Sequence, residues 1–373
     1  MSTLDEQIGS ELAALREAGT YKRFNTLESP QGPVVKMAGR GEVIVLSSNN
    51  YLGLAEHPDV VRAGIHGLER YGAGTASVRF ICGTFAPHLA LEHDLAELSA
   101  TDAALTYVSC WNANEAAIPT LADGTTVILS DELNHASIID AVRLAKPERK
   151  LIITDGVFSM EGDLAKLPDI LELACAYDAV VIVDDSHGVG VVGKTGRGVA
   201  EHFGVLGQVH VLTGTLGKAL GGAAGGYVAS SAEVCDLLAQ RSRPQLFSNA
   251  LPPTVACSAR AAVHVLRTRP DLVAKLRENT RWFRGALREV GFNPLDGESA
   301  IIPIIVGETA RAIEVSERLL ERGVFVTGFG FPVVPEGTAR IRVQMSAALE
   351  PVHLERALAA FVEVGRAAGL VRA

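Results

Sequence analysis

A lysine in a glycine-rich turn is the clearest chemical feature of this chain. In VHVLTGTLGKALGGAAGG (209–226) an apolar strand is expected to lead into a turn that carries Lys218, and four glycines follow within a few residues. Partial removal from water favours the neutral, nucleophilic form of a lysine amine. The glycines allow the backbone to approach a ligand closely. A solvent-exposed loop lysine would be the simpler interpretation if this residue stood alone, but other features accompany it.

Two acidic residues end another apolar strand. AVVIVDDSHGVGVVG (179–193) places Asp184 at the carboxyl end of that strand, and ligands bind at this edge of open α/β sheets. A carboxylate there could keep the ring nitrogen of a pyridine cofactor protonated, with His187 nearby. The alternative is an aspartate that caps the following turn, an interpretation that we favour for Asp185 but not for Asp184.

A possible phosphate site lies in YVSCWNANEAA (107–117), which is typical of a strand, a short turn and a helix start. Main-chain N–H groups at a helix N-terminus bind phosphate, and the amides of Cys110 and Trp111 would be the central pair. The signal is weak by itself, because every α/β protein has several such turns.

Three further polar residues could contribute to a site. His135 stands just before an expected helix in SDELNHASIID, where a histidine is more often a cap or a core residue than a catalyst. Asn49 lies in LSSNNYLGL, and Arg342 lies in ARIRVQM. An arginine can hold a carboxylate through two hydrogen bonds, although Arg342 could equally form a surface ion pair.

The elements that must position these residues alternate along the middle of the chain. Short aliphatic runs, which we predict to be strands, alternate with helical segments between about residues 60 and 266. The predicted strands are 104–109, 126–130, 150–155, 179–185, 209–214 and 225–230, and the clearest helices are 112–122, 135–145 and 169–178. Apolar strands that alternate with helices predict an α/β fold with a mainly parallel sheet covered on both faces.

The pattern changes after about Pro270. A helix (271–291), a strand (301–307), a helix (309–322), two strand-like runs (324–329 and 339–346) and a last helix (352–367) predict a small α+β domain. An amphipathic helix at the start carries Leu4, Ile8, Leu12 and Leu15 on one face and is expected to pack on it. We therefore predict an N-terminal helix and small-domain segment (1–50), a large cofactor-binding domain (51–270) and a small C-terminal domain (271–373).

Composition excludes several classes of protein. With 373 residues, 48% hydrophobic and 21% charged, the chain is typical of a folded globule. A net charge of -9 argues against a nucleic-acid partner. Five scattered cysteines without CxxC spacing argue against a metal site and fit a reducing compartment. Because no signal-peptide or membrane-spanning run stands out, we expect a cytoplasmic protein with no membrane partner.

Taken together, these segments resemble the α-oxoamine synthases, a family of fold-type I pyridoxal-phosphate enzymes. The resemblance covers nearly the whole chain. It rests on the ordered set SNNYLGLAEHP, ASVRFICGT, SDELNHASIID, TDGVFSMEGDLAKLP, VDDSHGVGVVGKTGRG, TGTLGKALGGAAGGY, QRSRPQLFSNALPP and FPVVPEGTARIRVQMSAA. One piece such as GKALGG would be weaker evidence, because a motif needs its structural context.

The resemblance implies a role for each candidate residue. Lys218 would hold pyridoxal 5'-phosphate as a Schiff base and remove the substrate's α-proton, Asp184 would pair with the pyridine nitrogen, and His135 would stack on the ring. His187 and Ser159 would contact the ring's 3-oxygen. The Cys110 and Trp111 amides and the Thr215 hydroxyl would bind the phosphate, and Ser248 would reach the phosphate of the partner subunit in a homodimer. Asn49 and Arg342 would hold the carboxylate of the amino acid.

The resemblance also implies an acyltransferase. ASVRFICGT and RSRPQLFSN look like the segments of members that condense glycine with acetyl-CoA to 2-amino-3-ketobutyrate and CoA, a reversible reaction of threonine breakdown. Members that condense alanine with pimeloyl-CoA are the alternative, and Thr75 lies where members contact the acyl chain. An aminotransferase or aldolase on the same fold would need no CoA. A non-catalytic subunit would be expected to lack Lys218 or Asp184.

One segment departs from the family's pattern. Members usually carry an additional strand and helix between the helix that ends near Lys146 and the strand KLIITD, and here only Pro147, Glu148 and Arg149 intervene. Loss of a strand and a helix from an α/β core would expose apolar surface on their neighbours. We therefore interpret the short connection as an omission of residues from the sequence.

Overall fold

The computed structural model describes residues 3–22, 24–122, 126–145 and 150–371. Its contacts divide the chain into two compact units. The small unit is Met1–Ser48, Glu278–Asp296 and Ile301–Ala373, and the large unit is Asn49–Arg277 and Gly297–Ala300. The divisions thus fall after residues 48 and 277, whereas the sequence pattern placed them after residues 50 and 270.

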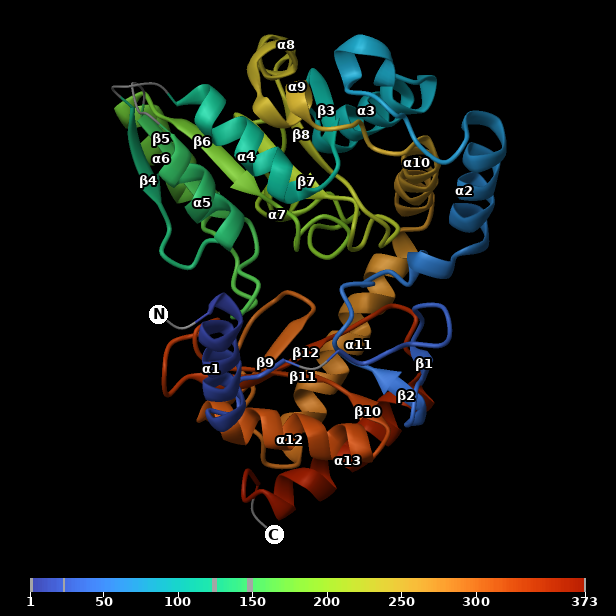
Figure 1. The fold of residues 1–373 in the computed structure, drawn as a ribbon, viewed down its shortest axis with the longest axis vertical. Coiled ribbons are helices and arrows are strands. Elements are labelled where there is room, and N and C mark those ends of the chain that lie inside the picture. The colour runs from blue at the N-terminus through green and yellow to red at the C-terminus, as the bar shows by residue number, and fades with distance from the viewer. Residues whose placement is uncertain (1–2, 23, 123–125, 146–149, 372–373) are drawn as a thin grey trace. The chain divides into compact units, whose positions relative to one another are not determined.

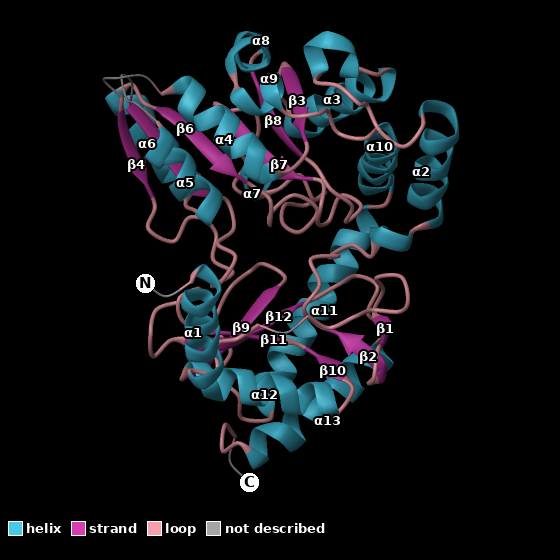
Figure 2. Cartoon of the chain, viewed as in Figure 1, coloured by secondary structure: helices cyan, strands magenta, loops and turns pink. Residues whose placement is uncertain are grey.

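A six-stranded sheet forms the centre of the large unit, in the order β3-β8-β7-β6-β5-β4 (Figure 2). Its strands are β3 (Ala103–Tyr107), β4 (Val127–Ser130), β5 (Lys150–Asp155), β6 (Val180–Asp184), β7 (Val211–Thr215) and β8 (Gly226–Ser230). Strands β4 to β7 are parallel, and β8 is antiparallel to both β7 and β3. The predicted, mainly parallel sheet is therefore present.

The register of the parallel strands brings the polar residues at their ends to one edge. Asp155 on β5 pairs with Asp184 on β6, and Asp184 pairs with Thr213 on β7. Because β8 runs the other way, it begins at this edge, where Gly226 pairs with Thr215. The carboxyl edge of the parallel strands therefore gathers the acidic residues and the turn that follows β7.

Helices pack around this sheet (Figure 1). Those of the large unit are η1 (Leu54–Glu56), α2 (Pro58–Tyr71), η2 (Arg79–Gly83), α3 (Ala86–Ser99), α4 (Cys110–Leu121), α5 (Ala136–Leu144), α6 (Leu167–Tyr177), α7 (Val199–His202), α8 (Ala232–Arg241), α9 (Arg243–Phe247) and α10 (Pro253–Thr268). One apolar core joins α4, α5 and α8 to the sheet, with Ile118, Ile138 and Leu238 fully buried in it. Apolar contact of this kind fixes where the start of α4 and the start of α5 lie relative to the strand ends.

Strand β4 forms one edge of the sheet, and its side chains are largely uncovered. Among the residues that the structure describes, β4 pairs only with β5. Val127 is 59% exposed and Leu129 is 62% exposed. Residues 146–149, where we predicted an omission, lie outside the described residues.

The small unit contains two three-stranded sheets, β1-β2-β10 and β11-β12-β9. Its elements are α1 (Leu4–Glu17), β1 (Val34–Met37), β2 (Gly41–Val45), the later part of α11 (Pro270–Glu289), β9 (Ile301–Gly307), α12 (Thr309–Glu321), β10 (Val324–Phe325), β11 (Thr327–Phe329), β12 (Ala339–Gln344) and α13 (Pro351–Ala367). Helix α1 forms as predicted, but it buries none of its residues. No helix in the described ranges is both long enough and apolar enough to cross a membrane.

Candidate active site

Asp184 occupies the last position of β6 and is 5% exposed. Its Oδ2 accepts a hydrogen bond of 2.7 Å from Asn114 Nδ2, and its Oδ1 accepts one of 3.0 Å from the main-chain nitrogen of Ser186. The sulfur of Cys110 lies 3.6 Å from Oδ2. A buried carboxylate surrounded by donors in this way is held in one orientation.

Lys218 lies in the turn after β7 and is half-buried, between the buried side chains of Leu216 and Ala219. Its positive charge acts on groups at the same sheet edge. Burial, and then the charge of Asp184, raises the pKa of Asp155 well above its usual value, and the charge of Lys218 opposes this rise. The turn therefore places the Lys218 amine at the edge that carries Asp155 and Asp184.

His135 stands immediately before α5, where its ring acts as a cap. The main-chain nitrogen of Ser137 donates to His135 Nδ1 at 3.2 Å, and the Ser137 hydroxyl lies 2.9 Å from the same nitrogen. The main-chain nitrogen of His135 donates to Asp155 Oδ2 at 3.0 Å. Burial is the main cause of a lowered pKa for His135, although part of its ring remains open to solvent. A lowered pKa favours the neutral imidazole.

The start of α4 supplies free donors at the same edge. Ser109 precedes the helix, and its Oγ accepts from the nitrogen of Asn112 at 3.2 Å. The amides of Cys110 and Trp111 belong to the first turn, where no preceding helical carbonyl can accept from them. A Cβ atom at position 226 would collide with the main-chain nitrogen of Cys110. Glycine at Gly226 therefore permits β8 to begin directly against this helix terminus.

Three of the remaining predicted residues lie at or after the carboxyl ends of β5, β6 and β7. His187 is 8% exposed, and its Nδ1 is hydrogen-bonded to the hydroxyl of the fully buried Tyr51 at 2.8 Å. Thr215 Oγ1 accepts from the nitrogen of Gly217 at 3.1 Å. Ser159 lies half-buried in the turn after β5. Each of these three residues lies in a segment that follows, or closes, one of the strands β5, β6 or β7.

The other predicted residues are placed differently. Asn49 and Ser248 are half-buried residues of the large unit, Asn49 before η1 and Ser248 directly after α9. Arg342 lies on β12 of the small unit, where its guanidinium donates to Gln344 Oε1 at 3.1 Å and covers the ring of Phe329 at 4.4 Å. With 9% of its surface exposed, Arg342 is not the surface ion-pair residue that we weighed as an alternative.

Comparison with known proteins identifies the family. The sequence model of the family "Aminotransferase class I and II" matches residues 41–148 and 145–361. The chain belongs to this family. An 8-amino-7-oxononanoate synthase from Symbiobacterium thermophilum is 45% identical over 99% of this chain and 100% of its own length. A 2-amino-3-ketobutyrate coenzyme A ligase from Mus musculus is 42% identical over 97% of this chain and 93% of its own.

A solved structure extends the likeness to the fold and the cofactor. Serine palmitoyltransferase with its pyridoxal-phosphate internal aldimine is 29% identical, with a TM-score of 0.93 over 99% of this chain and 100% of that chain. This chain is therefore a member of the α-oxoamine synthases with the fold-type I architecture, as its motifs predicted. It is a pyridoxal-phosphate-dependent acyltransferase of this type, and its cofactor is pyridoxal phosphate.

The side chains of this α-oxoamine synthase fit that cofactor. A pyridinium nitrogen needs a fixed carboxylate beside it, and Asp184 is held in place by Cys110, Asn114 and the main-chain nitrogen of Ser186. A phosphate needs donors, and the first turn of α4 offers main-chain amides beside Gly226. A covalent attachment needs an amine at the same edge, which Lys218 supplies. These are observations of the chain alone, and they agree with the cofactor that the family implies.

The comparisons also locate residues that this chain lacks. The alignment with the Symbiobacterium relative runs over 392 positions, whereas this chain has 373 residues, so the relative has residues without a counterpart here. The family model matches in two segments, residues 41–148 and 145–361, which overlap at residues 145–148. This is the connection at which the sequence departs from the family's pattern.

Sequence reasoning missed several residues of this site. Asn114, Ser137 and Tyr51 make direct hydrogen bonds to the predicted residues, and Asp155 lies beside Asp184. Asp155 carried a usable signal, because it ends its strand in the same way as Asp184 ends the next. The other three residues sit inside helices and turns where nothing in the local pattern separates them from ordinary polar residues.

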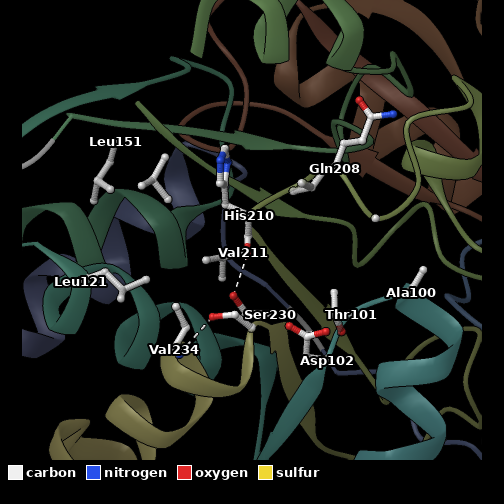
Figure 3. Close-up of a pocket in the computed structure, with 14 residues that line it drawn as sticks. Ala100, Thr101, Asp102, Leu121, Leu151, Gln208, His210, Val211, Ser230 and Val234 are labelled. Carbon is white, nitrogen blue, oxygen red and sulfur yellow. Dashed lines mark hydrogen bonds between the residues drawn. The ribbon is translucent and has the colours of Figure 1, made fainter. Parts of the chain in front are cut away.

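A cavity of about 350 Å³ lies at the opposite edge of the sheet (Figure 3). It is lined by residues at the amino ends of β5, β6 and β7, by the end of β8 and by the residues before β3, including His210, Ser230 and Asp102. Ser230 Oγ donates to the carbonyl of His210 there. Because Asp184 and Thr215 stand at the other ends of these strands, this cavity is separate from the candidate active site.

Proposed function

We propose that this enzyme condenses glycine with acetyl-CoA to give 2-amino-3-ketobutyrate and CoA. The observation that carries the proposal is the convergence of Asp184, His135 and the turn of Lys218 at one sheet edge, beside the start of α4. The choice of substrates is supported by similarity to enzymes named 2-amino-3-ketobutyrate coenzyme A ligase from Mus musculus and Escherichia coli, each 42% identical.

The proposed residues would divide the binding of the cofactor among them. Lys218 would hold it covalently, Asp184 would pair with the ring nitrogen, and neutral His135 would stack on the ring without adding charge. The phosphate would be bound by the Cys110 and Trp111 amides, the Thr215 hydroxyl and Ser248 of the partner subunit, and the ring's 3-oxygen by His187 and Ser159. Asn49 and Arg342 would hold the carboxylate of glycine.

When bound, pyridoxal phosphate supplies an electron sink for the α-carbon of an amino acid. Once the amino group of glycine has displaced Lys218 from its covalent bond, Lys218 Nζ is a free amine and would take the proton that the α-carbon of glycine loses. The α-carbon of glycine then bonds to the carbonyl carbon of the acetyl group, the carbon–sulfur bond breaks, and CoA leaves as its thiolate. Asp184 would stay in place beside the ring nitrogen, held by its hydrogen bonds from Asn114 and Ser186.

A second candidate is the condensation of alanine with pimeloyl-CoA. The relatives from Symbiobacterium thermophilum and Thermoanaerobacter pseudethanolicus, at 45% and 43% identity, are named 8-amino-7-oxononanoate synthase. Thr75, which we associate with the acyl chain, is 8% exposed, and its hydroxyl donates to the carbonyl of Ser77 at 3.1 Å. That hydrogen bond turns the only polar group of the Thr75 side chain towards the main chain.

Thiol release tests the two candidates together. The protein with pyridoxal phosphate is mixed with glycine or alanine and with acetyl-CoA or pimeloyl-CoA, and free CoA is measured alongside the amino-ketone product. We expect release with glycine and acetyl-CoA that Lys218→Ala abolishes. Faster release with alanine and pimeloyl-CoA would replace the first candidate by the second, and no release from any pair would contradict both.

We also propose that the enzyme is a homodimer with shared active sites. Phe80 and Ile81 on η2 and Phe247 on α9 are 65%, 68% and 72% exposed, and α9 contacts η2 within the large unit. An apolar patch of this kind is typical of an interface. Ser248, the residue that we assign to the partner's phosphate, directly follows Phe247.

A further inference from the structure

One buried amide joins four elements at the candidate site. Asn114 lies in the second turn of α4 and is 1% exposed. Its Nδ2 donates to Asp184 Oδ2 on β6 at 2.7 Å and to Ser137 Oγ on α5 at 2.9 Å. Its Oδ1 accepts from the hydroxyl of Thr213 on β7 at 2.7 Å. Both hydrogens of the amide and its carbonyl oxygen are therefore engaged.

The orientation of this amide is fixed by its neighbours. A carboxylate can only accept hydrogen bonds, so the side of Asn114 that faces Asp184 must be the NH₂ group. Its carbonyl oxygen then faces Thr213, whose hydroxyl is completely buried and donates to it. Rotation of the amide by half a turn would set two acceptors against each other, which is costly in a buried site.

The same amide determines which way the Ser137 hydroxyl points. Because Ser137 Oγ accepts from Asn114, its own hydrogen is available for His135 Nδ1, 2.9 Å away. The main-chain nitrogen of Ser137 also donates to Nδ1, at 3.2 Å. A nitrogen that accepts from two donors carries no proton, so the neutral ring must carry its proton on Nε2.

We propose that Asn114 is a positioning residue that fixes, through one amide, both the orientation of the Asp184 carboxylate and the tautomer of His135. The proposal rests on the proposed function, in which Asp184 pairs with the ring nitrogen of the cofactor and His135 stacks on the face of the ring. Asn114 couples them, because its two hydrogens go to Asp184 and to the serine that faces His135. Neither β6 nor α5 could shift alone without breaking one of these hydrogen bonds.

Cofactor affinity tests whether Asn114 orients the Asp184 carboxylate. The dissociation constant of pyridoxal phosphate is determined by absorbance titration of the apoprotein of wild type, Asn114→Ala and Asn279→Ala. Loss of one hydrogen bond to a charged group corresponds to a loss of affinity of about tenfold or more, which we expect for Asn114→Ala. Asn279→Ala is the matched control, because Asn279 is also buried and donates two hydrogen bonds, both to main-chain carbonyls of the small unit.

A double-variant cycle shows whether Asn114 acts through Asp184. In the Asp184→Ala background, Asn114→Ala should weaken cofactor binding less than about threefold, because the hydrogen bond is already lost. An equal loss in both backgrounds would mean that Asn114 is only a structural residue and would overturn the proposal. A cycle of this kind does not depend on the acyl donor, so its outcome is independent of the proposed reaction.

The tautomer of His135 tests whether Asn114 also acts on this histidine through Ser137. Nitrogen-15 chemical shifts of labelled histidine rings, with the His135 signals identified by their loss in His135→Asn, report which nitrogen is protonated. We expect a single Nε2-protonated form in wild type and a mixture of tautomers in Ser137→Ala and Asn114→Ala. Asn279→Ala should keep the wild-type form. A proton on Nδ1 in the wild type, or an unchanged tautomer in Asn114→Ala, would contradict the proposal even if Asn114→Ala lost cofactor affinity.

Discussion

Asp155 and Asp184 are register partners at the ends of neighbouring parallel strands, so two carboxyl groups stand side by side at the edge that also receives Lys218. Their surroundings differ. Asp184 accepts hydrogen bonds from Asn114 and Ser186, whereas burial and the charge of Asp184 raise the pKa of Asp155 well above its usual value. Burial therefore favours the protonated form of Asp155, whereas Asp184 is held by hydrogen bonds that its side chain accepts.

Exchange of Asp155 for asparagine should change activity little, whereas the same exchange of Asp184 should reduce activity strongly. Asp155→Asn replaces a carboxyl group whose protonated form burial favours by a neutral amide that can still accept from the main-chain nitrogen of His135, so we expect activity within about threefold of wild type. Asp184→Asn removes the anion from the ring nitrogen, so we expect a loss of about 100-fold or more in kcat/KM. Steady-state kinetics and the absorbance of bound cofactor measure both. Equal losses of kcat/KM in the two variants would contradict the different roles of Asp155 and Asp184.

Asp185 should make the stability of the protein depend on pH. It is 2% exposed, its Oδ2 accepts from the nitrogen of Val199 at 2.9 Å, and burial raises its pKa to about 8. A carboxyl group with a raised pKa binds its proton more tightly in the folded state. Its contribution to stability is therefore complete below about pH 4 and declines up to about pH 8, by about 1.4 kcal/mol per pH unit at most.

Urea unfolding between pH 5 and pH 8 measures this dependence. Asp185→Asn keeps an acceptor for Val199 but cannot ionise, so its stability relative to wild type should rise across the window by about 2 kcal/mol or more. Asp178→Asn serves as the control, since Asp178 is exposed and its left-handed backbone (φ of 52°) is tolerated by asparagine. A constant difference between wild type and Asp185→Asn at all pH values would show that Asp185 is ionised in the fold.

A methyl group at position 226 should displace the start of α4. The Cβ of Gly226→Ala would collide with the main chain of Cys110, and backbone cannot yield as a flexible side chain does. We expect Gly226→Ala to lose about tenfold or more in cofactor affinity, because the Cys110 and Trp111 amides move. Gly285→Ala is the control, since nothing lies within 4 Å of its added Cβ and alanine favours a helix. Unchanged cofactor affinity in Gly226→Ala would exclude these amides from the phosphate site.

A charge on the apolar patch should separate the proposed dimer. Phe247→Glu places a carboxylate on a side chain that is 72% exposed, so the fold of one subunit should persist while association weakens. Sedimentation should then show monomers, with weaker cofactor binding because Ser248 no longer reaches a partner. Leu173→Glu, on an apolar residue of α6 that is 53% exposed, is the matched control and should remain dimeric. A dimeric Phe247→Glu variant would move the interface elsewhere.

The strands of the six-stranded sheet and β9 were predictable from sequence because their apolar runs are continuous, whereas β1 and β2 were not predicted. Strand β9 covers the residues predicted for it, and β7 differs from its prediction by a residue or two at each end. The run 324–329 was predicted as one strand, but it forms β10 and β11, which belong to different sheets. An apolar run predicts extended backbone, but it does not say which neighbour the backbone pairs with, so the change of sheet near Val326 was not predictable.

Some residues of the candidate site could be predicted from sequence and others could not. Lys218 and Asp184 could be proposed from sequence because each leaves an apolar strand at the edge where ligands bind. Asn114 could not, because its three partners lie on β6, β7 and α5, which only the packed fold brings to it. A hydrogen bond between residues far apart in sequence leaves no local trace in either segment.

In the described part of the chain, β4 has a partner strand on one side only. An edge strand offers an open row of main-chain donors and acceptors, and on β4 the side chains of Val127 and Leu129 are exposed beside it. Native sheets often carry a lysine, a proline or a bulge at such an edge, and VILS supplies none of them. A strand that adds to this side of β4 would cover Val127 and Leu129, and a single lysine in place of Leu129 would oppose such an addition.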